Sequence, residues 1–433
     1  MLKDVIKSLI AIKQNEIPFD VIDRDIKLPI NKKKIITVPG VRRCGKSTLM
    51  MIAINELVKG GVPKENILWL GFDDERLVNL SSEDLDVVIA SYMEMYPDVP
   101  INEVHMFFDE IQLIPDWEYF VLRIYKTYCK NIYICGSNAT MLSTELSSAL
   151  RGYPLEYETY PLSFHEYCRF KGIKVNIYLE QDKAKLRNSF VEYNQSSAFP
   201  EVVLADSESD KLKLLHGYFD TMLLKDLAEH YNISNTEVVR YFVKRIMGNL
   251  TKPTSINSIY NDIRSQGLKV SKNDLYQWAN YICDIFMFIR IPKFERSLIK
   301  EHNSQPKYYF IDNGMRNVVL LSTSNDMGKY LENTVFLHIN RNKMPNEKIT
   351  YFQGNGECDF VLQTDEIVTA LYQVTWNMSD SDTRTREING LLEASSQTGC
   401  KNLYIITKDE EDIITKDNKQ INILPAWKWL LEK

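Results

Sequence analysis

The sequence predicts an α/β fold that begins with a parallel sheet of the P-loop type, and two observations predict it. Up to about residue 205, short runs of β-branched and aromatic residues alternate with helical segments, as in a mostly parallel sheet. Directly after the first run, residues 40–47 read GVRRCGKS, which fits the phosphate-loop pattern G-x-x-x-x-G-K-[ST] between a strand and a helix. Because 433 residues exceed the usual single core of about 250–300, two or three domains are expected.

The expected elements of this first part follow in chain order. The runs KIITV, NILWLGF, VHMFFDE and NIYICGS predict strands over 34–38, 66–72, 104–110 and 131–137. Two helices are predicted between them, over 46–59 and 82–96.

The pattern changes after about residue 205. Residues 207–250 read as helical. Two further helices around a glycine-containing turn and two short strands then predict a winged helix-turn-helix. From about 312 the order is helix, strands, helix, strand. We therefore expect an AAA-like P-loop domain, a helical winged-helix domain and an α/β nuclease-like domain, over 1–205, 206–311 and 312–433.

The composition narrows the class of protein. A net charge of -6 argues against a protein whose whole surface binds nucleic acid or membrane, but it is compatible with a local basic face. The absence of an apolar run of about 18 residues predicts no membrane span. The seven cysteines include no CxxC pair, and with six scattered histidines they predict neither a zinc site nor a disulfide framework. A reducing, cytoplasmic setting is expected.

The phosphate loop predicts a site for ATP and Mg²⁺. Backbone N–H groups of the loop and of the following helix point at phosphate oxygens in such loops. Lys46 is expected to reach the β- and γ-phosphates, and the Ser47 hydroxyl to ligate Mg²⁺. Arg42 and Arg43 are expected to contact phosphate or a neighbouring subunit, with solvation as the alternative. The predicted nucleotide-binding residues are Gly40, Arg42, Arg43, Cys44, Gly45, Lys46, Ser47 and Thr48.

Polar residues after the next strands complete the expected catalytic set. Asp109 and Glu110 end the apolar run VHMFF, so Asp109 is expected to hold Mg²⁺ and Glu110 to orient the attacking water. Asn138, with Ser137 as alternate, follows the fourth strand and is the candidate sensor of the γ-phosphate. Arg151 is a candidate arginine finger, and a plain surface arginine is the alternative.

These blocks together resemble a known family. GVRRCGKSTLM, FDDERL, FFDEIQLIPDWE, GSNATMLSTELSSALRG and YPLSFHEY are similar to bacterial and archaeal AAA-type ATPases, and FPEVVL, YFIDNGMRN and ENTVFLHI resemble the C-terminal region of that family. The resemblance runs over nearly the whole chain. It implies an ATP-binding domain, a winged helix and a C-terminal domain similar to PD-(D/E)xK nucleases, and it assigns no biological role.

The C-terminal residues match that nuclease pattern only in part. Glu332, Asp359 and Gln373 occur in the order of its metal ligands, but Thr375 stands where a lysine should stabilise charge or activate water. An amide is also a poorer ligand than a carboxylate for a hard cation. We expect a vestigial site without cleavage activity, unless a lysine from elsewhere in the fold replaces the missing one.

A basic segment predicts contact with DNA. Residues 251–311 hold five Asp/Glu against nine Lys/Arg, an excess of four positive charges that suits phosphate contacts; the nine are Lys252, Arg264, Lys269, Lys272, Arg290, Lys293, Arg296, Lys300 and Lys307. Leu275, Trp278, Ala279, Ile282 and Phe286 follow a helical period, so they are expected in the core, whereas Lys272, Asn273 and Gln277 face outward. A solvated surface or a protein-docking module is the alternative.

Three hypotheses follow from the sequence. The first is an ATPase, forming a possible homo-oligomer, that couples hydrolysis to work on DNA. The second is a nucleotide-gated switch that assembles with a protein partner and has little or no role on DNA. The third is a DNA-binding module whose ATP site sets the oligomeric state.

Overall fold

The computed structural model describes residues 2–136, 150, 152–320 and 326–432, and the chain divides into two units, Met1–Tyr160 and Pro161–Lys433. Asn138 and Arg151, the predicted sensor and arginine finger, lie outside the described residues, as does Ser137.

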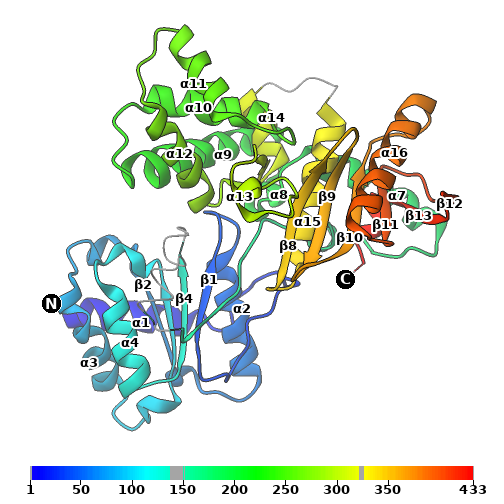
Figure 1. Cartoon of the computed structure of the whole chain (residues 1–433). Coiled ribbons are helices and arrows are strands. Elements are labelled where there is room, and N and C mark those ends of the chain that lie inside the picture. The colour runs from blue at the N-terminus through cyan, green and yellow to red at the C-terminus, as the bar shows by residue number, and fades with distance from the viewer. Residues whose placement is uncertain (1, 137–149, 151, 321–325, 433) are drawn as a thin grey trace. The chain divides into compact units, whose positions relative to one another are not determined.

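Unit 1 contains a five-stranded parallel sheet in the order β2-β3-β4-β1-β5 (Figure 1). Its strands are β1 (Ile35–Pro39), β2 (Ile67–Gly71), β3 (His105–Asp109), β4 (Asn131–Gly136) and β5 (Pro154–Glu156). Its helices are α1 (Leu2–Asn15), α2 (Lys46–Lys59), α3 (Asp86–Met95) and α4 (Trp117–Thr127). The predicted parallel sheet is confirmed, and β4 lies between the phosphate-loop strand β1 and the acidic strand β3.

Two hydrophobic cores cover the two faces of this sheet. Helices α1, α3 and α4 bury Ile10, Tyr92 and Phe120 against one face, in a cluster that includes Phe108 of β3. Helix α2 covers the other face, where the rings of Phe107 and its neighbours stack from strand to strand. Because both faces are covered, the strands read as nearly continuous apolar runs, which is why the sequence located them.

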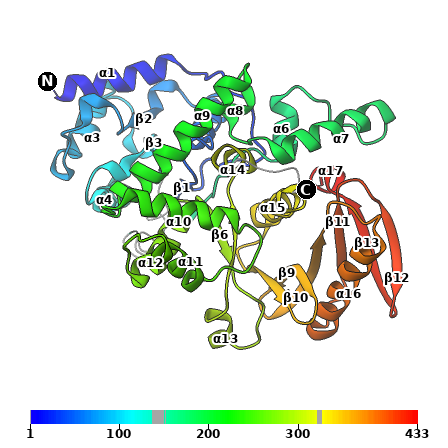
Figure 2. The ribbon, with the colours of Figure 1, turned by 90° about the horizontal axis from the view of Figure 1, so that it is seen from above.

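Unit 2 begins with helices and ends with a mixed sheet (Figures 1 and 2). The helical part holds α6 (Phe164–Phe170), α7 (Glu180–Gln195), α8 (Pro200–Leu204), α9 (Glu208–Thr221), a π-helix (Met222–Glu229), α10 (Thr236–Gly248), α11 (Ile256–Ser265) and α12 (Lys272–Asp284). An antiparallel pair follows, made of β6 (Phe288–Ile291) and β7 (Lys307–Phe310), with α13 (Leu298–His302) in their connection.

The six-stranded sheet of unit 2 has the order β12-β13-β11-β10-β9-β8. The remaining elements, in chain order, are α14 (Asn313–Leu320), α15 (Met327–Asn342), β8 (Glu347–Gln353), β9 (Glu357–Thr364), β10 (Ile367–Val374), α16 (Ser381–Thr398), β11 (Leu403–Thr407), β12 (Asp412–Lys416), β13 (Lys419–Pro425) and α17 (Ala426–Trp429). Helix α15 packs in one core cluster of the sheet and α16 in the other. The expected order of helix, strands, helix and strand after residue 312 matches these elements only in outline, because two helices precede β8, and three strands and α17 follow α16.

The division of the chain differs from the expected boundary near residue 205. Phe164 and Tyr167 of α6 and Phe190 of α7 are buried in one cluster with Val335 and Phe336 of α15. These helices therefore belong to the core of unit 2 and not to the ATPase domain to which the sequence assigned them. The amphipathic pattern of a helix reveals its buried face, but not the sheet against which that face packs.

Candidate nucleotide-binding site

The phosphate loop is held in a shape that requires its glycines. Gly40 has φ 152° and Gly45 has φ 98°, values that L side chains rarely adopt. A Cβ at Gly40 would also collide with the carbonyl oxygen of Thr159. Gly45 is the N-cap of α2 and supplies no side-chain cap, so the first N–H groups of this helix face the loop without that partner. The loop therefore has the backbone geometry of an anion site.

Lys46 folds back onto this loop. Its Nζ donates to the carbonyl oxygens of Gly40 at 3.2 Å and Val41 at 3.1 Å, and the residue is only 5% exposed. A phosphate that enters the loop must take the place of these two carbonyl groups as the partner of the ammonium. Because phosphate is an anion and pairs more strongly with the ammonium than a neutral carbonyl does, this exchange favours binding.

Arg24 anchors the loop from behind, which the sequence analysis did not anticipate. Its guanidinium donates at 2.9 Å to the carbonyl oxygens of Cys44 and Tyr160, and the residue is buried. The Cys44 thiol donates to the Thr159 carbonyl at 3.4 Å, and burial raises its pKa. Cys44 thus packs inside the loop, while Arg42 and Thr48 are half-buried and Arg43, with φ 69°, is exposed.

Ser47 and Asp109 lie close together across the neighbouring strand β4. Asp109 ends β3, and its Oδ1 accepts a hydrogen bond from the Cys135 thiol at 2.6 Å; Cys135 Sγ lies 4.0 Å from Ser47 Oγ. Burial raises the pKa of Asp109, and hydrogen bonds from Cys135 and Ser47 oppose that rise. The two expected Mg²⁺ ligands are therefore neighbours, with a cysteine between them that the sequence analysis did not single out.

Glu110 follows Asp109 with a different backbone direction. Its φ of 52° is left-handed, and its N–H donates to the Cys135 carbonyl at 3.0 Å. Its carboxylate accepts a hydrogen bond from the Gln112 side chain. The two adjacent acidic side chains therefore have different partners, Cys135 for Asp109 and Gln112 for Glu110.

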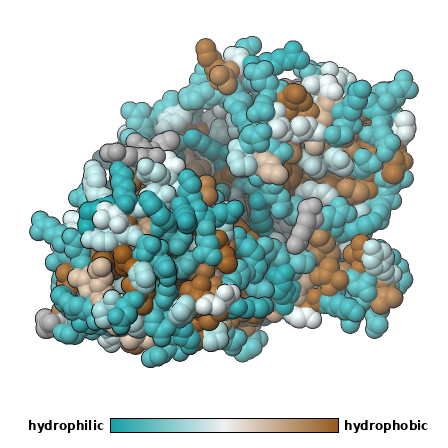
Figure 3. Space-filling view, turned by 90° about the horizontal axis from the view of Figure 1, so that it is seen from below, coloured by the Kyte–Doolittle hydropathy of each residue, from teal (hydrophilic) through white to brown (hydrophobic). Residues whose placement is uncertain are grey.

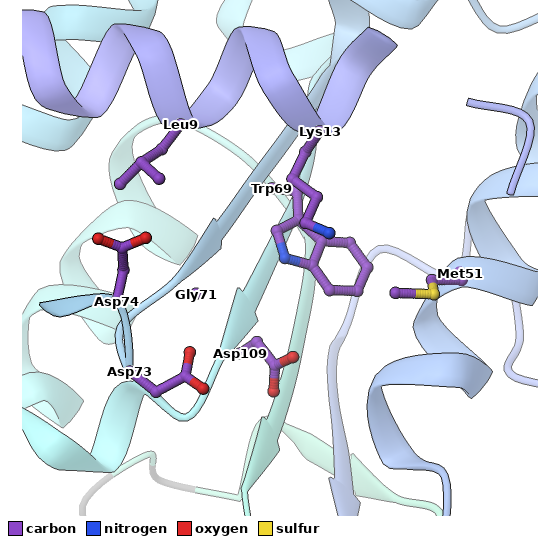
Figure 4. Close-up of a pocket in the computed structure, with 8 residues that line it drawn as sticks. All are labelled: Leu9, Lys13, Met51, Trp69, Gly71, Asp73, Asp74 and Asp109. Carbon is purple, nitrogen blue, oxygen red and sulfur yellow. The ribbon is translucent and has the colours of Figure 1, made fainter. Parts of the chain in front are cut away.

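A pocket of about 350 Å³ opens beside Asp109, at the carboxyl ends of β2 and β3 (Figure 4). Asp73 and Asp109 lie at one end of it, whereas Lys13, 5.9 Å from the Trp69 ring centre, lies at the other. The carboxylates would repel an unshielded phosphate, so the phosphate loop and this pocket present opposite charges to a ligand. Within the described residues, no three His, Cys, Asp or Glu side chains are placed to hold a metal ion by themselves. A Mg²⁺ ion in the nucleotide site therefore needs phosphate oxygens and water besides Ser47 and Asp109, as is usual for this ion.

The three predicted nuclease-like residues also meet, in unit 2. Asp359 of β9 donates its N–H to Gln373 Oε1 at 3.2 Å, and its Oδ2 accepts from the N–H of Val374 at 2.9 Å. Glu332 of α15 accepts from the Tyr309 hydroxyl at 2.9 Å. The side chain of Lys307, which the sequence assigned to the basic face, instead points into this cluster and is buried.

The other residues of the predicted basic face are at or near the surface. Seven of the remaining eight cations are exposed and Lys293 is half-buried. Leu275, Trp278, Ala279 and Ile282 are buried and Phe286 is half-buried, whereas Lys272, Asn273 and Gln277 are exposed. The predicted orientation of α12 is therefore confirmed, whereas the core position predicted for Phe286 is wrong, since this residue lies beyond the end of the helix and is only half-buried. Lys307 is the one cation of this segment that the sequence placed wrongly.

Comparisons with known proteins identify the first domain. Residues 32–168 match the model of an AAA domain, and residues 187–326 match a domain of unknown function (DUF8612). The uncharacterized protein MJ1544 of Methanocaldococcus jannaschii is 32% identical over 420 residues, which cover 95% of this chain and 91% of that protein. The chain belongs to the family of MJ1544. An uncharacterized protein of Haemophilus influenzae is 28% identical over 71% of this chain and 74% of its own.

Solved structures add little to this assignment. Cdc6p of Pyrobaculum aerophilum aligns with 73% of this chain and 92% of its own at 11% identity and a TM-score of 0.26. AMPPCP-bound DnaA of Aquifex aeolicus aligns with 64% of this chain and 86% of its own at 14% identity and the same TM-score. Scores this low leave the AAA domain assignment to the family model and to the phosphate loop.

The described helices were compared with the length and hydropathy that a membrane span requires. Among the helices described, none is long and apolar enough to cross a bilayer. The face of the molecule in Figure 3 is largely hydrophilic, with hydrophobic residues scattered over it.

Proposed function

We propose that this protein binds Mg·ATP in the phosphate loop of unit 1 and hydrolyses it. The observation that carries the proposal is the arrangement at the ends of β1, β3 and β4: a glycine-shaped anion loop with Lys46 lies beside Ser47 and Asp109. These residues fit the two cofactors, because the loop offers N–H groups and an ammonium to phosphate, and the hydroxyl and carboxylate are oxygen ligands suited to Mg²⁺.

Each residue has a distinct task in this proposal. Lys46 exchanges its two carbonyl partners for phosphate oxygens and balances their charge. Ser47 and Asp109 hold the metal, which neutralises charge on the phosphates when it is bound. Glu110, the residue after Asp109, accepts hydrogen bonds from water and orients it for attack. Arg151 and Asn138 keep their proposed roles as arginine finger and sensor.

Steady-state ATP turnover tests this proposal. Glu110→Gln keeps the size of the side chain and should abolish turnover while ATP binding persists, because only the acceptor for the water is weakened. Glu103→Gln, at an exposed glutamate of the same unit, is the matched control. Turnover in Glu110→Gln equal to that of Glu103→Gln would refute the role of Glu110, and wild-type protein without turnover would refute hydrolysis altogether.

We further propose that hydrolysis is coupled to work on duplex DNA through α11, α12 and the β6–β7 pair, which together form a winged helix. Exposed Lys269 and Lys272 flank the start of α12, and the capping box of Ser271 and Asp274 fixes that helix end. Phosphate contacts predict that DNA stimulates turnover and that the stimulation fades as salt rises. The double variant of Lys269 and Lys272 to Gln should lose the stimulation. The same change at exposed Lys171 and Lys174 should not.

The second candidate is a nucleotide-gated switch that assembles with a protein partner. Leu298 and Ile299 of α13 favour it, because they are adjacent and 80% and 74% exposed in the β6–β7 connection. Apolar side chains at such a tip suit a protein surface better than a phosphate backbone. Turnover that is indifferent to DNA, together with a partner that co-purifies with the Glu110→Gln form and is lost when Leu298 is changed to Ser, would favour this candidate over DNA work.

A further inference from the structure

The acidic cluster of unit 2 encloses a lysine. Nζ of Lys307 lies 2.6 Å from Glu357 Oε1 and 3.4 Å from both Glu332 Oε1 and Asp359 Oδ1, and the Lys307 side chain is 1% exposed. These carboxylates come from α15 and from β9, whereas the lysine comes from β7. One ammonium thus stands among three carboxylates supplied by two other elements.

Local packing fixes this ammonium in its place. The ring centre of Tyr351 lies 5.2 Å from Nζ, a distance at which an aromatic face attracts a cation. Glu357 is held at the start of β9 by a close approach of α16, since a Cβ on Gly390 would collide with the Glu357 backbone. The Glu393 carboxylate accepts from the N–H of Gly356 at 2.7 Å and steadies the same turn. The lysine is therefore surrounded by rigid structure.

Three oxygens of the cluster accept hydrogen bonds from donors other than Lys307, and one of them, Glu332 Oε1, is shared with that lysine. Glu332 Oε1 accepts from the Tyr309 hydroxyl, Asp359 Oδ2 from the N–H of Val374, and Gln373 Oε1 from the N–H of Asp359. The Gln373 side-chain amide in turn donates to Glu387. A Mg²⁺ ion requires near-octahedral oxygen ligands at about 2.0–2.1 Å, and these groups are already committed to N–H and O–H donors. The donor set does not fit a divalent metal as long as Lys307 occupies its centre.

The position of Lys307 makes it the cation of the cluster. Carboxylate oxygens of Glu332, Glu357 and Asp359 all lie within 3.4 Å of its Nζ, and nearby opposite charges favour the charged form of a buried amine.

We propose that the ammonium of Lys307 is a built-in cation that takes the place of the catalytic metal in this nuclease-like site. The cluster then joins β7 to the sheet of β9 and β10 as an internal ion cluster, and it neither binds a catalytic divalent ion nor cleaves phosphodiesters. The lysine supplies the positive charge that is missing at Thr375. It does not supply the catalytic role of that charge, because a buried ammonium that is paired with carboxylates cannot contact a substrate phosphate.

Manganese binding to the nucleotide-free full-length chain tests this proposal, by calorimetry or by the electron paramagnetic resonance of free Mn²⁺. We expect the wild type and Asp359→Asn to bind Mn²⁺ equally, because the wild-type cluster holds no Mn²⁺ ion. Lys307→Met empties the centre of the cluster while keeping its volume, and it should bind Mn²⁺ at least about ten-fold more tightly than the wild type. Adding Asp359→Asn to Lys307→Met should abolish the gain. Lys293→Met, at a half-exposed lysine paired with Glu295, is the control and should gain nothing.

Two results would overturn the proposal. One is a Mn²⁺ site in the wild type that disappears in Asp359→Asn, or Mn²⁺-dependent DNA cleavage that the same variant abolishes, since Lys307 would then stand beside a metal and not in its place. The other is a folded Lys307→Met protein without added Mn²⁺ affinity. Comparison of the wild type with Asp359→Asn decides the matter even if Lys307→Met does not fold. ATP turnover is measured separately, so failure here and failure of the ATPase proposal are distinguishable.

Discussion

Cys135 offers a specific test of how the proposed Mg²⁺ site of unit 1 is held. Its thiol donates to Asp109 Oδ1 at 2.6 Å, and its Sγ lies 4.0 Å from Ser47 Oγ. If Ser47 held a metal ion, Cys135 would remain as the side-chain donor that fixes the direction of Asp109. The change Cys135→Ala removes this donor and leaves a buried carboxylate less well oriented.

The magnitude follows from the kind of hydrogen bond. A hydrogen bond to a charged group is worth about 1.5–3 kcal/mol, and because a thiol is a weak donor we expect about 1 kcal/mol. That energy corresponds to a roughly five-fold higher Mg²⁺ concentration for half-maximal ATP turnover. Cys135→Ser restores a donor, so its Mg²⁺ concentration for half-maximal turnover should fall between those of Cys135→Ala and the wild type.

Turnover measured over a Mg²⁺ titration at saturating ATP is the assay. Cys129→Ala is a matched control, because the Cys129 thiol is buried in the same unit but donates to the Val104 carbonyl, away from the phosphate loop. The reasoning is refuted if Cys135→Ala requires no more Mg²⁺ than Cys129→Ala, or if it requires less.

Three further changes test the site and the fold. Lys46→Met should weaken ATP binding about 10–100-fold in a fluorescent-nucleotide titration, since a charge-assisted contact is lost, whereas Lys59→Met at the other end of the same helix should not. Burial lowers the pKa of His105 to about 4. Between pH 6.5 and pH 4 the unfolded chain therefore takes up a proton that the folded chain does not. The free energy of unfolding should fall over this range by at most about 3 kcal/mol. Urea unfolding at pH 5 and pH 7.5 should show a smaller pH dependence in His105→Phe, and an unchanged one would contradict this. Gly390→Ala forces a Cβ into the backbone of β9 and should destabilise the protein by about 1–3 kcal/mol in thermal unfolding, whereas Gly217→Ala meets nothing within 4 Å and should not destabilise.

The parallel sheet was predictable because its strands are buried on both faces. The strand predicted over 104–110 is β3 (His105–Asp109), and the helix predicted over 46–59 is α2 (Lys46–Lys59). Gly45 and Lys46 mark the start of that helix, and a marker made of neighbouring residues can be recognised in a single sequence. The core face of α12 was predicted for the same reason, since a period of 3.6 residues shows which side of a helix is apolar.

Contacts between distant residues were not predictable in this way. Arg24 holds the phosphate loop through two backbone carbonyls, and nothing in the residues around it forms a motif. In the sequence, Cys135 is one apolar residue of the run NIYICGS, and only the strand order places it between Ser47 and Asp109. Helix α7 was assigned to the wrong core because its apolar face fits any apolar sheet. In each case the missing information is the tertiary neighbour and not the local conformation.

The acidic cluster around Lys307 shows the same limit most clearly. Thr375 is a position without charge, and the prediction of an inactive site rested on this residue and on the amide of Gln373. Lys307 lies 68 residues earlier in the chain, within a run that the sequence assigned to a basic surface. Its sequence neighbours gave no reason to bury it, because a buried lysine is stable only when carboxylates from elsewhere surround it. A missing residue in a motif therefore does not reveal the charge of a site. The charge depends on which side chains the fold brings to the same point, and here the fold supplies the cation from a different strand.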